Sequence, residues 1–119
     1  MLAYQGGLLV SSASANDDIH RCSLAGASQG SCQNGSTLNF GQQMAYACNG
    51  DILVAGFSSN NIVRLNAATG AVLTAYTAAG ARGVAQLGNG NVIWTSAVGA
   101  FVLDTGTGAS TQVYTGAGR

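Results

Sequence analysis

The side chains that could take part in chemistry are few, and a small group of them lies near the start of the chain. His20 is the only histidine, and Asp17 and Asp18 shortly precede it. Two adjacent carboxylates could bind a cation, or they could belong to a solvated loop. A lone histidine supports neither a catalytic triad nor a zinc site. No Asp-x-Asp-x-Asp-Gly calcium pattern is present, so we expect no metal site, no other cofactor and a structural role for His20.

The cysteines do not form a metal-binding pattern either. Cys22, Cys32 and Cys48 are an odd number, with no CxxC and no Cys/His cluster at zinc-ligand spacing. Cys22 and Cys32 could face each other across a hairpin and form a disulfide. Alternatively, all three are free thiols that pack as small hydrophobic side chains, which is the interpretation we favour.

The composition excludes several classes of partner. Only 7% of the residues are charged, the net charge is zero, and Lys, Glu and Pro are absent. This leaves no basic footprint for nucleic acid or an anionic membrane. The missing Lys and Glu argue against exposed helices, whereas abundant Gly, Ser, Thr and Asn suit short strands and turns. No apolar run approaches a membrane span, and no signal-peptide pattern opens the chain, so a cytoplasmic location is the default expectation.

One pattern recurs three times along the chain. Residues 6–11, 50–55 and 90–95 are equivalent apolar strands; Leu9 and Leu53 are 44 residues apart, and Leu53 and Ile93 are 40 apart. This period is the length of a four-stranded propeller blade. The strands are apolar without strict alternation, which indicates that both faces are covered, as they are between neighbouring blades. A β-sandwich would predict more alternation. We therefore predict an all-β chain of three four-stranded blades, at about 1–43, 44–82 and 83–119.

Turn residues divide the second and third copies into strands. In the second copy the pattern predicts strands at 44–48, 52–57, 62–66 and 72–77, with Asn49-Gly50 as the turn of a two-residue hairpin. The third copy repeats this with strands at 84–87, 92–96, 101–104 and 111–115. Trp94 falls in an apolar strand, so we expect it between two blades with its indole N–H hydrogen-bonded.

The stretch NGDILVAGFSSNNIVRLNAATGAVL, residues 49–73, and its echo from Asn89 carry a family resemblance. They resemble the repeats of six-bladed β-propellers of the NHL, YVTN and gluconolactonase-like kinds. The resemblance implies blades and specifies no activity. Gluconolactonase-like enzymes bind a divalent metal in the central channel through acidic and amide side chains. Here the expected innermost strands offer Tyr46 and Gln86 but no Asp, and the chain has no Glu, so lactonase chemistry is not predicted.

Three blades are too few to close a ring, which normally needs four to eight. The outer faces of the first and third blades would then be exposed apolar patches. Cyclic dimers are the commonest closed assemblies, and we expect a homodimer of six blades with Arg119 of one chain near Met1 of the other. A fragment of a longer propeller and blades folded back into a barrel are the alternatives.

Polar side chains are expected to gather on one face of the propeller. The loops between second and third strands share this face with the segments that link blades, and long insertions tend to mark the functional face of a repeat protein. Amide and hydroxyl groups there suit a small polar or carbohydrate ligand. The predicted ligand-binding residues are Asn16, Asp17, Asp18, Gln42, Gln43, Asn60, Asn61 and Arg82. The predicted function is a non-catalytic β-propeller binding or interaction module, and the alternative is a metal-dependent propeller hydrolase or lyase acting at the channel mouth.

Overall fold

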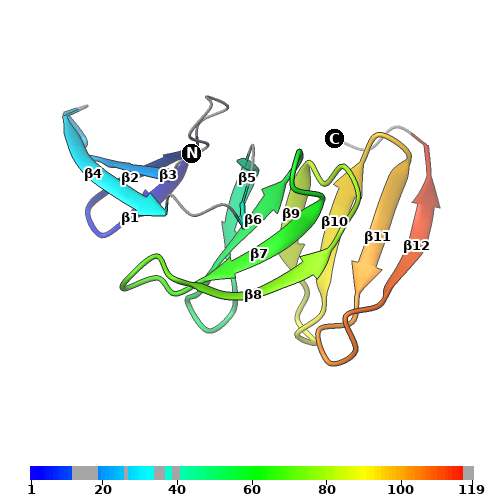
Figure 1. Cartoon of the computed structure of the whole chain (residues 1–119). Helices are drawn as coiled ribbons and strands as arrows, with labels where there is room; N and C mark the ends of the chain where they lie inside the picture. Colours follow the sequence, from blue (N-terminus) through cyan, green and yellow to red (C-terminus); the bar gives the residue numbers. More distant parts are fainter. Residues whose placement is uncertain (12–18, 26, 34–36, 39–40, 117–119) are drawn as a thin grey trace.

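The computed structural model describes residues 1–11, 19–25, 27–33, 37–38 and 41–116. These residues form three four-stranded antiparallel sheets that follow one another along the chain (Figure 1). Blade 1 contains β1 (Leu2–Tyr4), β2 (Gly7–Ser11), β3 (Ile19–Cys22) and β4 (Ser28–Gln33). Blade 2 contains β5 (Gly41–Tyr46), β6 (Ile52–Gly56), β7 (Asn61–Leu65) and β8 (Val72–Thr77). Blade 3 contains β9 (Gly83–Gln86), β10 (Val92–Ser96), β11 (Gly99–Leu103) and β12 (Ser110–Thr115).

Each strand pairs with its neighbours in chain order, so each sheet is a simple meander from an innermost to an outermost strand. The prediction of an all-β chain with three four-stranded blades is therefore confirmed. The strand limits predicted for β8 and β10 agree with the structure. The innermost strand of blade 2 differs, because β5 starts at Gly41 and ends at Tyr46, where the sequence predicted 44–48.

The predicted two-residue hairpin at Asn49-Gly50 is wrong. Tyr46 pairs with Ile52, so residues 47–51 join the two strands. The Oδ1 atom of Asn49 accepts the N–H of Asp51 at 3.0 Å, and this side-chain turn requires the longer loop. Two-residue hairpins lie elsewhere, at residues 5–6 of blade 1 and at residues 97–98 of blade 3. At residues 5–6 both backbone φ angles are positive, as a type I′ turn requires.

Blade 2 is buried on both faces, as a blade between two neighbours should be. In β6 the side chains of Ile52, Leu53, Val54 and Ala55 are all 0% exposed. Leu53 and Ala55 pack in a cluster with blade 3, and Ile52 and Val54 pack in a cluster with blade 1. We call the side of a blade that faces the preceding blade its near face, and the opposite side its far face.

Trp94 lies in the junction between blades 2 and 3, as expected. Its side chain is buried, and its ring stacks on Phe101 with 4.3 Å between the centroids. The indole Nε1–H donates to the hydroxyl of Ser110 at 3.0 Å, so its polar edge is paired inside an otherwise apolar junction. This confirms both parts of the prediction for Trp94.

Candidate functional site

The predicted ligand-binding residues fall partly within the described structure. Asn16, Asp17 and Asp18 lie outside the described residues. Gln42 and Gln43 lie on β5, Asn60 lies in the turn from β6 to β7, and Asn61 is the first residue of β7. Arg82 directly precedes β9. The turn and the segment before β9 meet at one edge of the blades, as the sequence predicted.

Asn60 joins the β6–β7 turn to the segment that links blades 2 and 3. Its backbone φ is +55°, a conformation that asparagine tolerates better than most residues. The Oδ1 atom accepts the N–H of Gly80 at 2.9 Å, and the backbone oxygen accepts the N–H of Ala78 at 2.9 Å. The oxygen atoms of Asn60 therefore hold the chain rather than face a ligand.

Asn61 and Gln43 also form contacts within the protein. The Nδ2 group of Asn61 donates to the backbone oxygen of Thr37 at 2.8 Å, and its Oδ1 accepts the hydroxyl of Ser59 at 2.7 Å. Gln43 accepts the backbone N–H of Val84 with its Oε1 atom at 2.7 Å. An amide side chain on a strand can bind either a ligand or the backbone, and here both residues connect separate segments.

Arg82 keeps unused hydrogen-bonding capacity. Its guanidinium carbon lies 5.5 Å from the centre of the Phe57 ring, which is the geometry of a cation–π contact. The backbone N–H donates to the oxygen of Thr95 at 2.8 Å. The Nε–H group is buried, and no acceptor among the described residues lies within hydrogen-bonding distance. Among the predicted residues that the structure describes, Arg82 and the exposed side chain of Gln42 are therefore the ones we consider for a ligand.

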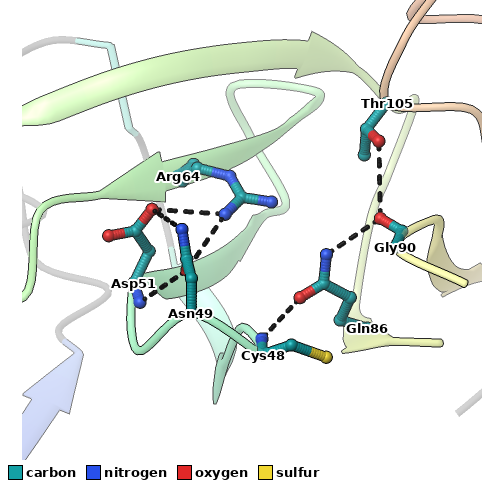
Figure 2. Close-up of polar contacts among 7 residues, drawn as sticks. All are labelled: Cys48, Asn49, Asp51, Arg64, Gln86, Gly90 and Thr105. Carbon is teal, nitrogen blue, oxygen red and sulfur yellow. Dashed lines mark hydrogen bonds and ion pairs between the residues drawn. The ribbon is translucent and has the colours of Figure 1, made fainter. Parts of the chain in front are cut away.

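The opposite edge of blade 2 carries an ion pair with a structural role (Figure 2). Arg64 on β7 lies 3.2 Å from the Oδ2 atom of Asp51 in the β5–β6 loop. The Nδ2 group of Asn49 donates to the same carboxylate oxygen at 3.0 Å. Arg64 thus fixes the loop to the neighbouring strand, and the carboxylate of Asp51 is paired.

Gln86 connects blades 2 and 3 at this edge, as Figure 2 also shows. Its Oε1 atom accepts the backbone N–H of Cys48 at 2.5 Å, and its Nε2 group donates to the oxygen of Gly90 at 2.8 Å. The hydroxyl of Thr105 donates to the same oxygen at 3.4 Å. The side chain that the sequence placed at a possible channel site therefore joins two blades.

A hollow of about 160 Å³ lies on blade 3 where it borders β5 of blade 2, and it was not among the sites that the sequence predicted. Its walls are Gln43, Gly83, Val84, Ala85, Ile93 and Thr95. In blade 3, Gly83 pairs with Thr95, and at the equivalent register position of blade 2, Gln43 pairs with Ala55. Blade 3 therefore has a glycine where blade 2 has a glutamine side chain. The hydroxyl of Thr95 is buried and has no hydrogen-bond partner in the described structure. Comparing Gly83 with Gln43 and Thr95 with Ala55 in the aligned copies could have indicated this site.

The two terminal faces of the three-blade array are apolar and incompletely covered. The far face of blade 3 carries Ala85, Ile93, Thr95, Ala100 and Val102. The near face of blade 1 carries Ala3, Leu8, Val10, His20 and Cys22. Ala3 and Ala85, which lie on the innermost strands, are exposed, and the other residues of the two faces are half-buried.

All three cysteines have free thiols, in agreement with the favoured interpretation, but only Cys22 and Cys32 are half-buried; Cys48 is exposed, so the expectation that it packs as a small hydrophobic side chain is wrong. Cys22 lies on the near face of blade 1, whereas Cys32 packs against the cluster between blades 1 and 2. Burial raises the pKa of the Cys32 thiol. Burial also raises the pKa of the neighbouring Tyr4 phenol, which donates a hydrogen bond to the backbone oxygen of Ala67.

Among the described residues, no group of three or more His, Cys, Asp or Glu side chains is placed to hold a metal ion. The described part of the chain also contains no helix that is long and apolar enough to cross a membrane.

No protein-family model matches the chain, and no curated protein matches it either. Solved structures do match. Virginiamycin B lyase from Staphylococcus aureus is similar over 94% of this chain and 39% of its own, with a TM-score of 0.68 and 15% identity. An auxiliary nutrient binding protein from Bacteroides ovatus is similar over 90% of this chain and 26% of its own, with a TM-score of 0.65 and 17% identity.

A protein of unknown function from Bacteroides caccae is similar over 94% of this chain and 47% of its own, with a TM-score of 0.53 and 13% identity. The chain therefore spans less than half the length of each of these structures. The neighbours are β-propeller-like proteins, and at these identities the likeness shows the fold.

Proposed function

We propose that the chain is a non-catalytic interaction module, in which two copies complete one six-bladed ring that binds a small polar or carbohydrate ligand. In this assembly the far face of blade 3 in one copy packs on the near face of blade 1 in the other, and the reciprocal junction closes the ring. The observation that carries the proposal is the match between the terminal faces and the faces already buried inside the chain.

The far face of blade 3 is equivalent to the far face of blade 2, which blade 3 covers. Leu53, Ala55 and Ile62 on blade 2 are each 0% exposed because blade 3 covers them. Their equivalents by strand register are Ile93, Thr95 and Ala100, and each of these is half-buried. A further blade would cover them in the same way.

The near face of blade 1 shows the same contrast. Ile52, Val54, Val63 and Leu65 on blade 2 are 0% exposed against blade 1. The equivalents Leu8, Val10, His20 and Cys22 remain half-buried. Covering apolar surface is worth about 25 cal/mol per Å², and with a net charge of zero the copies have little electrostatic repulsion to overcome.

The ligand part of the proposal rests on the loop edge that bears Arg82 and Gln42. The guanidinium of arginine can bind a carboxylate or a sugar hydroxyl through charge-assisted hydrogen bonds, and the side chain of Arg82 is half-buried at this edge. One similar structure is named a nutrient-binding protein and another a lyase. We favour binding, since Asp51 at the opposite edge is already paired with Arg64.

The oligomeric mass tests the assembly. Light scattering on the purified chain should give twice the chain mass of 11.8 kDa. Ile93→Arg places a charge on the far face of blade 3 and should give a folded monomer. Val113→Arg is the matched control, because Val113 is 58% exposed on the outer strand β12, and this variant should remain dimeric. A wild-type chain that stays folded and monomeric at every concentration would overturn the assembly.

Thermal shifts test the ligand. Neutral and acidic monosaccharides should raise the melting temperature of the wild-type dimer and have less effect on Arg82→Ala. No shift with any sugar would remove the carbohydrate part of the proposal. Stoichiometric bound metal in elemental analysis, lost in Asp17→Ala and Asp18→Ala, would replace binding with the metal-dependent hydrolase or lyase.

A further inference from the structure

We propose that His20 of one copy enters the hollow on blade 3 of the other copy and forms a hydrogen bond with the hydroxyl of Thr95. This inference rests on the proposed dimer and identifies the polar contact that would fix the register of its junctions. It begins from an unusual group on each of the two terminal faces.

Thr95 places a hydroxyl where the internal junction has only a methyl group. Its equivalent in blade 2 is Ala55, which is 0% exposed under blade 3. The Thr95 Oγ1 atom is buried and has no hydrogen-bond partner in the described structure. Buried hydroxyls are normally paired, and a rotation about χ1 between staggered rotamers would turn this one toward the hollow that Thr95 lines.

His20 is the complementary group on the near face of blade 1. In blade 1, His20 on the third strand pairs with Val10 on the second strand. In blade 3, Phe101 on the third strand pairs in the same way with Trp94 on the second strand. The two positions are therefore equivalent, and an imidazole on blade 1 stands where blade 3 has a phenyl ring. A neutral imidazole provides one donor and one acceptor, either of which can satisfy a hydroxyl.

The junction between blades 2 and 3 shows what these positions meet. Phe101 packs against the same apolar cluster that contains Ala55 and Ile62. A near-face ring at the Phe101 position therefore packs against the cluster that the far-face residues of the preceding blade help to form. When the same junction is formed between two copies, His20 comes against the far-face residues of blade 3, and Thr95 is the one among them with an unpaired buried hydroxyl in the described structure.

The hollow provides the space for this ring. Gly83 replaces the glutamine found at the same register position in blade 2, which leaves about 160 Å³ beside Thr95 and Ile93. This is far more than the roughly 15 Å³ that holds one water molecule on a comparable measure. The far face of blade 3, as defined above, carries no charged side chain, so a neutral imidazole suits it.

A double-mutant cycle on the dimer tests the pair. Thr95→Val removes the hydroxyl with little change of shape, and His20→Phe restores the ring type of the internal junction. Each single variant should raise the dimer dissociation constant by about 10- to 100-fold, because each dimer contains two junctions and each loses a hydrogen bond. The dissociation constant of the double variant should be far smaller than the product of the two single effects predicts. The dissociation constant of Thr95→Ser, which keeps the hydroxyl, should stay within about threefold of the wild-type value.

The outcomes separate this inference from the proposal beneath it. A wild-type dimer whose two single-variant effects multiply in the double variant would overturn the His20–Thr95 pair and leave the dimer intact. A wild-type chain that never dimerises would overturn the dimer itself. Far-UV circular dichroism of each variant, measured where it is monomeric, would show whether the blades remain folded.

Discussion

The Oε1 atom of Gln43 lies 2.7 Å from the backbone nitrogen of Val84 and accepts its hydrogen bond. This contact joins β5 of blade 2 to β9 of blade 3. Gln86 on β9 provides the opposite contact, since its Oε1 accepts the N–H of Cys48 beyond the other end of β5. Two glutamines on neighbouring innermost strands therefore connect the blades in opposite directions. The junction is held by polar contacts along its inner edge as well as by its apolar core.

Replacing Gln43 by alanine should destabilise the chain. Val84 is only 5% exposed, so losing the acceptor leaves a poorly solvated backbone N–H unpaired. We expect a loss of about 1–2 kcal/mol in the free energy of unfolding, measured by urea denaturation. Gln42→Ala is the control, because the Gln42 side chain is exposed and its removal should change stability by less than about 0.5 kcal/mol. Equal effects in both variants would contradict a structural role for Gln43.

The fold could be predicted because its signal is periodic. The 40- to 44-residue spacing of Leu9, Leu53 and Ile93 and the two-sided apolar strands require blades that cover one another. The loop limits could not be predicted as well, because the turn at Asn49 depends on a side-chain hydrogen bond to Asp51. That bond competes with the two-residue hairpin that Asn-Gly usually forms.

The site was harder to predict for a related reason. The amides of Asn60 and Gln43 have the chemistry of ligand-binding groups, yet they bind Gly80 and Val84, which are 20 and 41 residues away. Sequence alone cannot tell a ligand from a distant backbone group. The hollow beside Thr95 lies where Gly83 replaces a glutamine of the second copy, so its signal in the sequence is an absent side chain, which is easily overlooked until the register of β9 and β10 is known.

Gly70 should tolerate no side chain. Its φ is +76°, and a Cβ atom there would lie 2.0 Å from the backbone oxygen of Cys32. Gly70→Ala should therefore lower the free energy of unfolding by at least about 2 kcal/mol, from backbone strain and a clash with the main chain. Gly88→Ala is the matched substitution, since a Cβ atom there would meet no other atom within 4 Å and the φ of Gly88 is not in the left-handed range. It should be neutral or slightly stabilising, and similar losses in the two variants would contradict this account.

Stability should fall at alkaline pH through Tyr4 and Cys32. Burial raises the pKa of both groups above their ordinary values of 10.0 and 9.0. The unfolded chain therefore releases these protons first, and the folded state loses relative stability as pH rises from about 9. Below that pH both groups are protonated in both states, and their contribution is complete. Unfolding in urea at a series of pH values should show this decline.

The double variant Tyr4→Phe with Cys32→Ala provides the control for that decline. It removes both ionisable groups, so its stability should depend less on pH above about 9 than that of the wild type. Its absolute stability should be lower at neutral pH, because Tyr4 also donates a hydrogen bond to Ala67. A slope equal to that of the wild type would show that other groups cause the alkaline loss.

Thiol labelling should report the proposed dimer directly. Cys22 is half-buried on the near face of blade 1, whereas Cys48 is exposed in the β5–β6 loop of the central blade. In a variant that keeps Cys22 alone, the rate of reaction with N-ethylmaleimide should fall several-fold as the protein concentration rises through the dissociation constant. A variant that keeps Cys48 alone should react at a constant rate. Adding Ile93→Arg to the first variant should remove the protection, because the covering face can no longer pack. A Cys22 rate that is independent of concentration, in a chain whose mass is that of a dimer, would show that the two copies meet through some other surface.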